Sequence, residues 1–505
     1  MVTYKRPGVY VEEQLRTRNP SPSPSSTTAV FVASHGQGPL EPHLVRSWSD
    51  FTRVYGGFPS RTSLLPYSVF QFFNNGGRDA YILRITGAGP VVADTIFQDQ
   101  GATPDDTILV EAVNPGGWGN NISIGIENSD DDAFNLTVYL GGTGLLNIVE
   151  RFPGLTMDPD SAMYVETKIN SVLSGSSYIT VHDVNSSNLV DDEYSVVRPE
   201  ETGINPVALT GGDNGAEPVT GDFIDGLVLL ETIDRTYDLN FPGVTEAAVI
   251  NAAIEHVADK GTGFVIIDPP SNLDVTGVID WAEGINNSSY GAVYYPYVHI
   301  SDPGANTPGS TRLVPPGGSI AGVCARTDAS RGVWKAPAGL EARVSGGVST
   351  ERRFSNEDLE QLNSNHINTI RHAPGAGFVV WGARTLRKNR ADMYVPIRRS
   401  LNWLRKTLQS STEWAVFEPN DSNLWESLET SISRFLTGYW QQGGLRGVDP
   451  EEAFYVKCDA DINPVSSIEA GVVNVEIGVA LQYPAEFVVI KLSQWEGGSA
   501  VTEVA

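Results

Sequence analysis

The sequence predicts a multidomain protein that combines the α/β and α+β classes. Its 505 residues exceed what one hydrophobic core ordinarily holds, so several domains are expected. Helical and strand patterns alternate over residues 29–90 and 216–375, which is typical of sheets whose strands are joined by helices. Residues 91–215, which lie between these stretches, are rich in Gly, Asn, Asp, Ser and Thr and carry short β-prone runs. They indicate an inserted β-rich domain.

Residues 1–28 are predicted to form an extended N-terminal arm and linker. Val9–Glu12 is a short β-prone run, and the prolines between residues 19 and 26 exclude a helix after it. A single strand on a tether is not stable alone, because its backbone groups stay unpaired and its loss of entropy is not offset. Two alternatives remain open: the strand folds back as an edge strand of its own domain, or it adds to a sheet of another subunit.

The two alternating stretches predict a sheet with parallel strands. Pro269 and Pro270 end a buried apolar run, and two such runs alternate with helices, which favours parallel pairing through right-handed crossovers. The expected elements are a strand at 29–33, helices at 49–55 and 65–73, a strand at 80–85, a helix at 245–258, a strand at 263–268, a helix at 275–284, a strand at 292–299 and a helix that opens near 317.

Residues 376–505 are predicted to form a compact C-terminal α/β module. Ile397, Leu401, Leu404 and Leu408 return to one side of a helix at 3.6 residues per turn. A second helix over 424–439 has a cap at Asp421 or Ser422 and ends at Gly443-Gly444. Strands are expected at 377–386, 414–420, 454–458, 472–481 and 486–492.

The charge of the chain is strongly acidic overall but locally basic. A net charge of −27 argues against a nucleic-acid partner. Between Arg371 and Lys406, however, nine basic residues face one acid, Asp392, and they include Arg398, Arg399 and Arg405 on the polar sides of the first helix. Such an island indicates a face for an acidic partner. The alternative is a solvated helix face with packed side-chain stems.

Several function classes find little support in the residues. No apolar run reaches the ~20 residues that span a bilayer, and the first residues lack the apolar segment of a signal peptide, so we expect no direct membrane insertion and a cytoplasmic site of synthesis. Only Cys324 and Cys458 are present, so no disulfide framework is expected.

An α/β hydrolase-like enzyme is the alternative from another class. Ser319 follows two glycines and Asp268 follows a strand, but the Gly-x-Ser-x-Gly pattern fails at Ala321. The acidic run Asp130–Asp132 lacks the spacing of a calcium loop, and no zinc-peptidase or phosphate-loop pattern occurs. We therefore expect no catalytic, metal or cofactor-binding residues and no cofactor.

Several phrases of the sequence resemble contractile tail sheath proteins of phages and of related bacterial injection particles. In the C-terminal quarter these are Val380–Leu386, Trp414–Asn420, Gly443–Gly447, Glu451–Phe454 and Asn474–Ala480. Further phrases that are similar to the family are Pro7–Glu13, Val45–Phe51, Asn74–Tyr81, Asn114–Asn121 and Arg326–Gly339. The resemblance covers almost the whole chain and is weakest between about 125 and 215.

The resemblance implies four parts. They are the arm at 1–28, a subtilisin-like α/β core at 29–90 plus 216–375, an inserted β-rich outer domain at 91–215, and a C-terminal sheath domain at 376–505 with a donated C-terminal strand. It also implies a structural subunit without enzymatic activity, part of a virion tail or of a released contractile particle, whether phage or non-phage. Many copies would form helical rings around an inner tube and contract to drive it through a target envelope. The expected partners are further copies of the chain, the inner tube, and baseplate and tail terminator proteins.

The resemblance also assigns candidate site residues. The donated strands would contain Val9, Tyr10, Val11, Glu12, Phe487, Val488, Val489 and Ile490. The strand acceptor would contain Val473, Val475, Ile477 and Val479. The contact with the inner tube would use Arg398, Arg399, Arg405 and Lys406.

Overall fold

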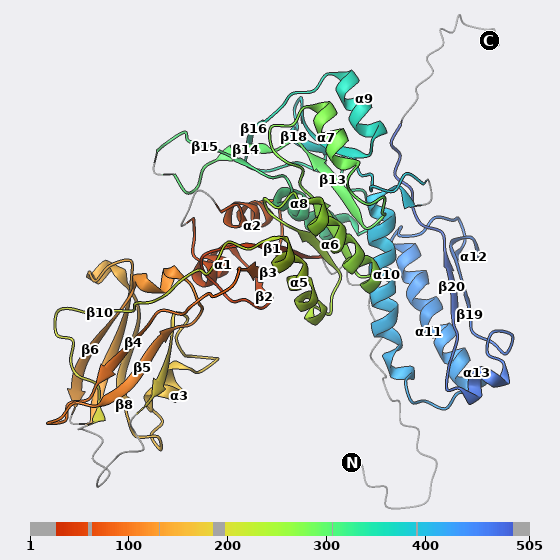
Figure 1. Ribbon diagram of the computed structural model, residues 1–505. Coiled ribbons are helices and arrows are strands. Elements are labelled where there is room, and N and C mark those ends of the chain that lie inside the picture. Colours follow the sequence, from red (N-terminus) through yellow and green to blue (C-terminus); the bar gives the residue numbers. More distant parts are fainter. Residues whose placement is uncertain are drawn as a thin grey trace, which may run out of the picture.

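The computed structural model describes residues 27–58, 63–130, 132–184, 197–305, 307–389 and 392–487. Figure 1 shows three parts: a central α/β part, a β-rich part on one side of it, and a C-terminal part of two long helices and a small sheet on the other. The mixed α/β multidomain class predicted from the sequence is confirmed. Among the described residues, no helix has the length and apolar character needed to cross a membrane.

The central part is built on a sheet that has eight strands within the described residues. Their order is β18 (Gly377–Trp381), β17 (Ile367–Ala373), β13 (Gly291–Tyr295), β12 (Gly263–Ile267), β11 (Tyr237–Asn240), β1 (Thr28–Ser34), β3 (Ala80–Ile85) and β2 (His43–Val45). The strands from β17 to β3 pair in parallel, whereas the outermost strands β2 and β18 are antiparallel to their neighbours. The parallel pairing predicted for β12 and β13 is confirmed.

Helices cover both faces of this sheet. Ala29, Phe31 and Ala33 of β1 enter one hydrophobic cluster, and Val30 and Val32 enter another, because successive side chains of a strand point to opposite faces. A strand buried on both sides can therefore be apolar throughout. The first face carries α1 (Trp48–Tyr55), α2 (Leu65–Asn74) and α8 (Gly317–Arg331). The second carries α5 (Thr220–Gly226), η4 (Leu227–Thr232), α6 (Ala247–Lys260), α7 (Val275–Ala282) and α9 (Asn356–Ser364).

Two strands of the central part differ from their predicted extent. The run at 292–299 forms two strands, because Pro296 has no N–H for the ladder and ends β13. The second of them, β14 (Val298–Ser301), joins a separate small sheet with β15 (Thr311–Val314) and β16 (Gly347–Thr350). The run that begins at Gly377, expected in the C-terminal module, pairs instead with β17 at the edge of the central sheet.

The β-rich part holds two antiparallel sheets around a hydrophobic cluster of its own. Ile122, Ile124 and Ile126 of one sheet and Ile108 and Val110 of the other enter this cluster. One sheet contains β4 (Asp94–Gln98), β5 (Asp106–Ala112) and β9 (Ile179–Asp183). The other contains β10 (Val207–Ala208), β6 (Ile122–Asp130), β7 (Ala133–Leu140) and β8 (Ile148–Thr156). Short helical segments η1 (Gly117–Asn121), η2 (Leu145–Asn147) and α3 (Val165–Ile169) complete the part.

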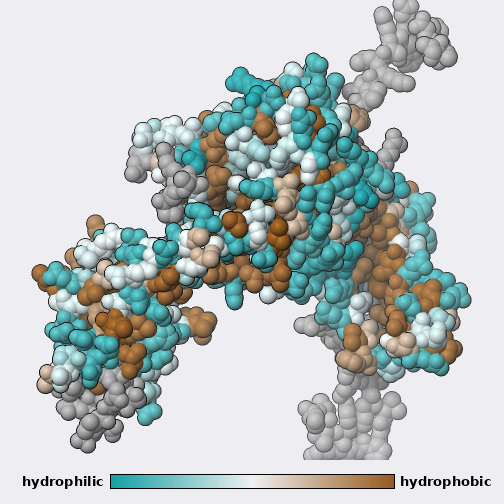
Figure 2. All heavy atoms as spheres, in the orientation of Figure 1, coloured by the Kyte–Doolittle hydropathy of each residue, from teal (hydrophilic) through white to brown (hydrophobic). Residues whose placement is uncertain are grey.

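The C-terminal part contains the two predicted helices. They are α10 (Val395–Thr412), whose first turns pack against the central part, and α11 (Ser422–Gln441). Asp421 caps α11 by accepting hydrogen bonds from the backbone N–H groups of Asn423 and Leu424. The remaining elements are η6 (Glu413–Ala415), α12 (Pro450–Ala453), β19 (Phe454–Lys457), α13 (Val465–Glu469) and β20 (Glu476–Val479). Figure 2 shows hydrophobic residues at the surface of this part, whereas hydrophilic atoms cover much of the central part.

Two predicted strands of the C-terminal part are wrong or too long. The strand at 414–420 is wrong, because α10 continues into η6 and Val416 and Phe417 lie exposed on the connection to α11. The strand at 472–481 shortens to β20. Of the strand expected at 486–492, Glu486 and Phe487 form no strand, and the rest lies outside the described residues.

Candidate functional site

The predicted strand acceptor lies in the two-stranded sheet of the C-terminal part. Ile477 and Val479 of β20 are opposite Val456 and Phe454 of β19. These side chains pack with Val475 on the core formed by α10 and α11, while Val473 belongs to a neighbouring cluster. In the described part of the chain this sheet has two strands, so each strand keeps one edge without a ladder partner there. Such an edge presents backbone N–H and C=O groups to an added strand.

The chain leaves this sheet through a polar clamp at Glu486. Its carboxylate accepts two hydrogen bonds from Arg384, at 2.8 Å from Nε and 2.6 Å from Nη2. The Tyr394 hydroxyl donates a third, at 3.1 Å. Burial acts to raise the pKa of Glu486, but these donors outweigh it and hold the pKa below its ordinary value. The last described residues are therefore held against the segment that precedes α10.

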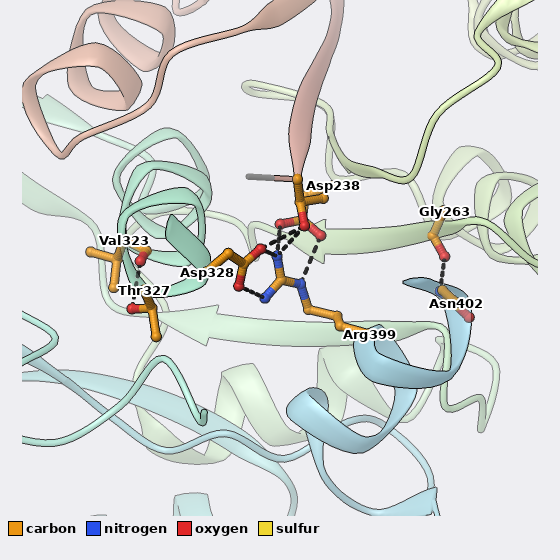
Figure 3. A network of polar contacts seen from close by, with 8 residues as sticks. Asp238, Gly263, Val323, Thr327, Asp328, Arg399 and Asn402 are labelled. Atoms are coloured by element: carbon orange, nitrogen blue, oxygen red, sulfur yellow. Dashed lines mark hydrogen bonds and ion pairs between the residues drawn. The ribbon is translucent and has the colours of Figure 1, made fainter. Parts of the chain in front are cut away.

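A second clamp lies where the N-terminal residues enter the central sheet (Figure 3). Arg399, on the second turn of α10, donates to both oxygens of Asp238 on β11 and to both oxygens of Asp328 on α8. The hydroxyl of Thr27 accepts from Arg399 Nη2 at 3.0 Å and donates to Asp328 at 2.6 Å. The clamp thus joins α10, the sheet, α8 and the residue before β1.

The electrostatics of this second clamp depend on its burial. Arg399, Asp238 and Asp328 are 4%, 3% and 2% exposed, so water does not screen their charges. The pKa of the Arg399 guanidinium is held above its ordinary value, because the attraction of the two carboxylates outweighs the loss of solvation. Burial raises the pKa of Asp238 to about 6, while Arg399 acts in the opposite direction. Arg399 therefore stays charged and is committed to contacts inside the chain.

These contacts correct the predicted basic surface. Arg399 does not lie on a free helix face, and neither does Arg398, whose side chain bonds to Ser289 and stacks over the Tyr290 ring at 4.4 Å. Lys406 is paired with Asp234. Among the described residues, Arg405 is the one member of the four that is both exposed and without an ion pair. A contact of Arg405 and Lys406 with an inner tube stays a prediction.

Most predicted donor residues cannot be placed. Val9, Tyr10, Val11 and Glu12 and the C-terminal Val488, Val489 and Ile490 lie outside the described residues. Phe487 is described, and its side chain is exposed directly after the Glu486 clamp. The donation of either strand therefore stays a prediction.

The described residues around Ser319 and Asp268 do not form the catalytic geometry that the hydrolase alternative requires. Ser319 is 1% exposed inside α8, and its hydroxyl has no hydrogen-bond partner among them. Asp268 accepts from Asn240 Nδ2 at 2.9 Å and from the Gly317 N–H at 2.7 Å, so it fixes the start of α8. A buried serine held away from solvent cannot meet a substrate, and its position argues against a nucleophilic role.

A cleft at the carboxyl ends of β1, β3 and β11 offers no acid–base pair either. His35 lines this cleft, and its ring nitrogens are bonded to the Tyr55 carbonyl and the Ser63 hydroxyl. Burial lowers the pKa of His35 to about 4, so the ring is neutral near pH 7. Among the described residues, no cluster of His, Cys, Asp or Glu is arranged to hold a metal ion.

Sequence reasoning missed both clamps. Arg384 and Glu486 are 102 positions apart, and Arg399 and Asp238 are 161 apart, so no local pattern links them. One signal was available for Arg399, which follows Ile397 near the start of a helix whose apolar stripe packs inward. An arginine beside such a stripe can be buried when carboxylates meet it.

Two models of sheath domains match consecutive stretches of the chain. The phage tail sheath protein central domain matches residues 239–386, and the phage tail sheath C-terminal domain matches residues 388–494. The chain belongs to the tail sheath family. The family resemblance predicted from the sequence is thereby confirmed, and the Glu486 clamp and the two-stranded sheet lie within the matched stretches.

Relatives in the sheath family cover most of the chain. It is 25% identical over 417 residues to the tail sheath protein of Vibrio phage KVP40, a match of 72% of this chain and 60% of that protein. It is 26% identical over 297 residues to a putative prophage major tail sheath protein of Pseudomonas aeruginosa, covering 57% of this chain and 73% of that one. The chain thus spans about 60% of the length of the phage KVP40 relative.

Solved sheath structures share the fold. The PVC sheath complex of an extracellular contractile injection system, in its contracted state, matches 98% of this chain and 99% of its own with a TM-score of 0.58 and 23% identity. The sheath tail protein of Listeria innocua matches 86% of this chain and 89% of its own with a TM-score of 0.61 and 13% identity.

Proposed function

We propose that the chain is the subunit of a contractile sheath. Many copies assemble as helical rings around an inner tube, and contraction drives the tube through a target cell envelope. Family membership, through the matches over residues 239–386 and 388–494, is the observation that carries this proposal. No nucleotide or cofactor is needed for the stroke, because energy can be stored as the difference between two rigid-body packings of the subunits.

Strand exchange between subunits is the proposed linkage. An arm strand at Val9–Glu12 and a C-terminal strand at 487–490 would add to the open edges of β19 and β20 in other copies. The clamps at Thr27 and Glu486 support this proposal, since each fixes the chain at the residue from which an arm continues. A linkage through backbone hydrogen bonds can persist while the rigid parts of the subunits rotate.

The remaining proposals concern the surroundings of the subunit. Its partners would be the inner tube, the baseplate and a tail terminator protein, with assembly in the bacterial cytoplasm. Phage tails and non-phage injection particles are both compatible, because family relatives come from phages and a solved neighbour from an extracellular contractile injection system. The parallel sheet covered by helices supports a subtilisin-like arrangement of the central part without its activity.

Electron microscopy of the purified chain tests the proposal. We expect hollow striated tubes from the full chain, alone or co-expressed with a tube protein, and globular particles from a variant that lacks residues 1–19. Tubes from both proteins would support the sheath function and show that the arm is not an essential linker. Failure of the full chain to polymerise even beside its tube protein would contradict the sheath function.

The tube contact needs a separate charge-reversal test. Arg405→Glu changes an exposed side chain, so it should weaken co-assembly with the tube protein and leave the subunit folded. Arg353→Glu, at an exposed position that has no ion pair among the described residues, is the matched control. Equal co-assembly of the two variants would remove Arg405 from the tube contact.

A further inference from the structure

We propose that one short stretch of chain, residues 383–389 and 392–399, is the mechanical junction of the subunit. We call this stretch the junction segment. A force applied to either terminal arm would be transmitted to the rest of the subunit through it. The inference rests on the proposed function for the source of the pull, which would be neighbouring copies of the chain. Its structural basis is independent of assembly.

Both clamps belong to the junction segment. Arg384 near its beginning binds Glu486, the penultimate described residue at the C-terminal end. Arg399 at its end binds Thr27, the first described residue at the N-terminal end. Thr27 and Glu486, which lie near the two ends of the described chain, are thus held by residues 15 positions apart. Each of them is fixed by a charged side chain of the same segment.

The two described halves of the junction segment are joined to each other directly. They are cross-linked by backbone hydrogen bonds, from the Thr385 N–H to the Met393 carbonyl at 2.8 Å and from the Val395 N–H to the Ala383 carbonyl at 2.9 Å. Tyr394 forms an antiparallel β-bridge with Arg384, and its hydroxyl also donates a hydrogen bond to Glu486. Force that reaches Arg384 can therefore pass along these backbone hydrogen bonds to the first turns of α10 and to Arg399.

The segment is also anchored to the central sheet. The side-chain amide of Asn368 on β17 donates to the Arg384 carbonyl at 2.8 Å and accepts from the Arg384 N–H at 2.7 Å. The Leu386 N–H bonds to the Gly291 carbonyl of β13 at 2.9 Å. On the far side, Asp238 joins Arg399 to β11. A pulled arm would thus move the central sheet as one body instead of peeling a single element from it.

The strengths of the two clamps differ. Behind Glu486 the chain is held by backbone bonds of Ala480 to Ala453 and Arg446 and then by β20, which pairs with β19 on one side only within the described residues. Behind Thr27 it continues directly into β1, which is paired on both sides. When both ends are pulled, the Glu486 clamp is expected to yield first and the Thr27 clamp later.

Force spectroscopy on single full-length chains tests the junction. Tags at the two ends of the chain carry the handles, and the rate of the first rupture is recorded at constant force. Glu486→Gln removes the ion pair and keeps the shape, so we expect the first rupture to be about tenfold faster, as for the loss of one charge-assisted hydrogen bond. Glu341→Gln removes an exposed ion pair with Arg331 and should leave the rate unchanged.

Thr27→Val provides a second arm of the experiment. We expect it to leave the first rupture unchanged and to accelerate a later event, since Thr27 is clamped separately from Glu486. An unchanged first rupture in Glu486→Gln, or an equal change in Glu341→Gln, would overturn the junction. Failure to form tubes in the microscope while the rupture difference persists would instead count against the sheath function alone.

Discussion

At the scale of single residues, Arg399 carries the densest polar contacts. It meets two carboxylates, from β11 and α8, and the hydroxyl of the residue before β1, in a buried site. Burying these charges costs several kcal/mol per ion, and their mutual attraction offsets that cost only when the geometry is good. The net contribution of the intact cluster to stability is therefore small, but removing one member leaves buried charge uncompensated.

Replacement of this arginine should be severe. Arg399→Met keeps the length of the side chain and leaves Asp238 and Asp328 buried without their cation, so we expect the free energy of unfolding to fall by about 3–5 kcal/mol. Denaturant unfolding measures the change. The control is Arg331→Met, which breaks an exposed ion pair with Glu341 and should cost under about 1 kcal/mol. Equal losses in the two variants would contradict a structural role of the cluster.

Asp268 gives the central part a predictable dependence on pH. Burial raises its pKa to about 7, against the hydrogen bonds from Asn240 and Gly317 that lower it. An unfolded aspartate titrates near 3.9, so between about pH 4 and 7 the folded state keeps a proton that the unfolded state has lost. The contribution of Asp268 to the free energy of unfolding should therefore fall by about 1.4 kcal/mol per pH unit as pH rises through this window.

Asp268→Asn should remove that dependence, because an amide does not ionise. The stabilisation from Asp268 is complete below about pH 4 and lost above about pH 7, so the difference between the wild type and the variant should follow this course. Denaturant unfolding at several pH values measures it. Asp280→Asn, at an exposed position on α7, is the control and should keep the wild-type slope. A slope that is identical in wild type and Asp268→Asn would refute the assignment.

At the scale of elements, the contact of α2 with α8 depends on two glycines. A Cβ atom on Gly318 would lie 2.2 Å from the Ser68 carbonyl oxygen, and one on Gly322 would lie 2.5 Å from that of Phe72. Real Cβ atoms do not approach a backbone oxygen so closely, and backbone cannot swing aside as a side chain can. The two helices therefore approach closely only because these positions lack side chains.

Gly318→Ala should force the helices apart. We expect overpacking to lower the free energy of unfolding by about 1–3 kcal/mol. Gly221→Ala in α5 is the matched control, since no atom lies within 4 Å of its added Cβ atom, and there the change should stabilise the chain by about 0.5–1 kcal/mol. The two substitutions are thus expected to move the unfolding midpoint in opposite directions, and shifts of the same sign would contradict the close approach.

Elements with long periodic patterns could be predicted from the sequence, and short apolar runs could not. The stripe from Ile397 to Leu408 predicted α10, because a period of 3.6 over several turns has no strand equivalent. The run Trp414–Phe417 has no such period: its first two residues belong to η6, and Val416 and Phe417 are exposed on the connection that follows, with Phe417 at a φ of 68°. Whether a short run is buried depends on tertiary contacts, which a local pattern does not contain.

The candidate site divides in the same way. The acceptor residues Ile477 and Val479 could be placed on a strand because alternation is a local property. The clamps could not be predicted, since they join residues more than 100 positions apart. Arg398 and Arg399 of the basic island were wrongly given a surface role, because charge alone does not reveal a buried partner. Long-range polar contacts emerge only once the fold brings the elements together.

At the scale of the whole molecule, the negative charge is unevenly distributed. Between residues 91 and 215, Asp and Glu outnumber Lys and Arg by 20 to 3, while the chain as a whole carries −27. This stretch of the sequence therefore carries most of the excess, and Figure 1 shows the β-rich part that it forms standing away from the central part. In an assembly of many copies such parts repel one another. Salt weakens this repulsion, because charges farther apart than the Debye length, about 10 Å at 0.1 M, are largely screened.

Polymerisation should consequently increase with ionic strength. If the chain assembles as proposed, raising the salt from about 0.02 M to about 0.5 M shortens the screening length several-fold and should lower the critical concentration for tubes, measured by sedimentation. A variant with Asp105→Asn, Asp106→Asn and Asp160→Asn, three exposed positions of the β-rich part, should assemble at lower salt than the wild type.

Three exposed acids of the C-terminal part, changed in Glu426→Gln, Glu429→Gln and Glu451→Gln, provide the matched control for total charge. An equal gain in both variants would assign the effect to net charge, and a gain confined to the first would assign it to repulsion between neighbouring β-rich parts. Assembly that falls as salt rises would show instead that attraction between charged surfaces, such as the ion pairs expected around Arg405, governs the contacts between copies.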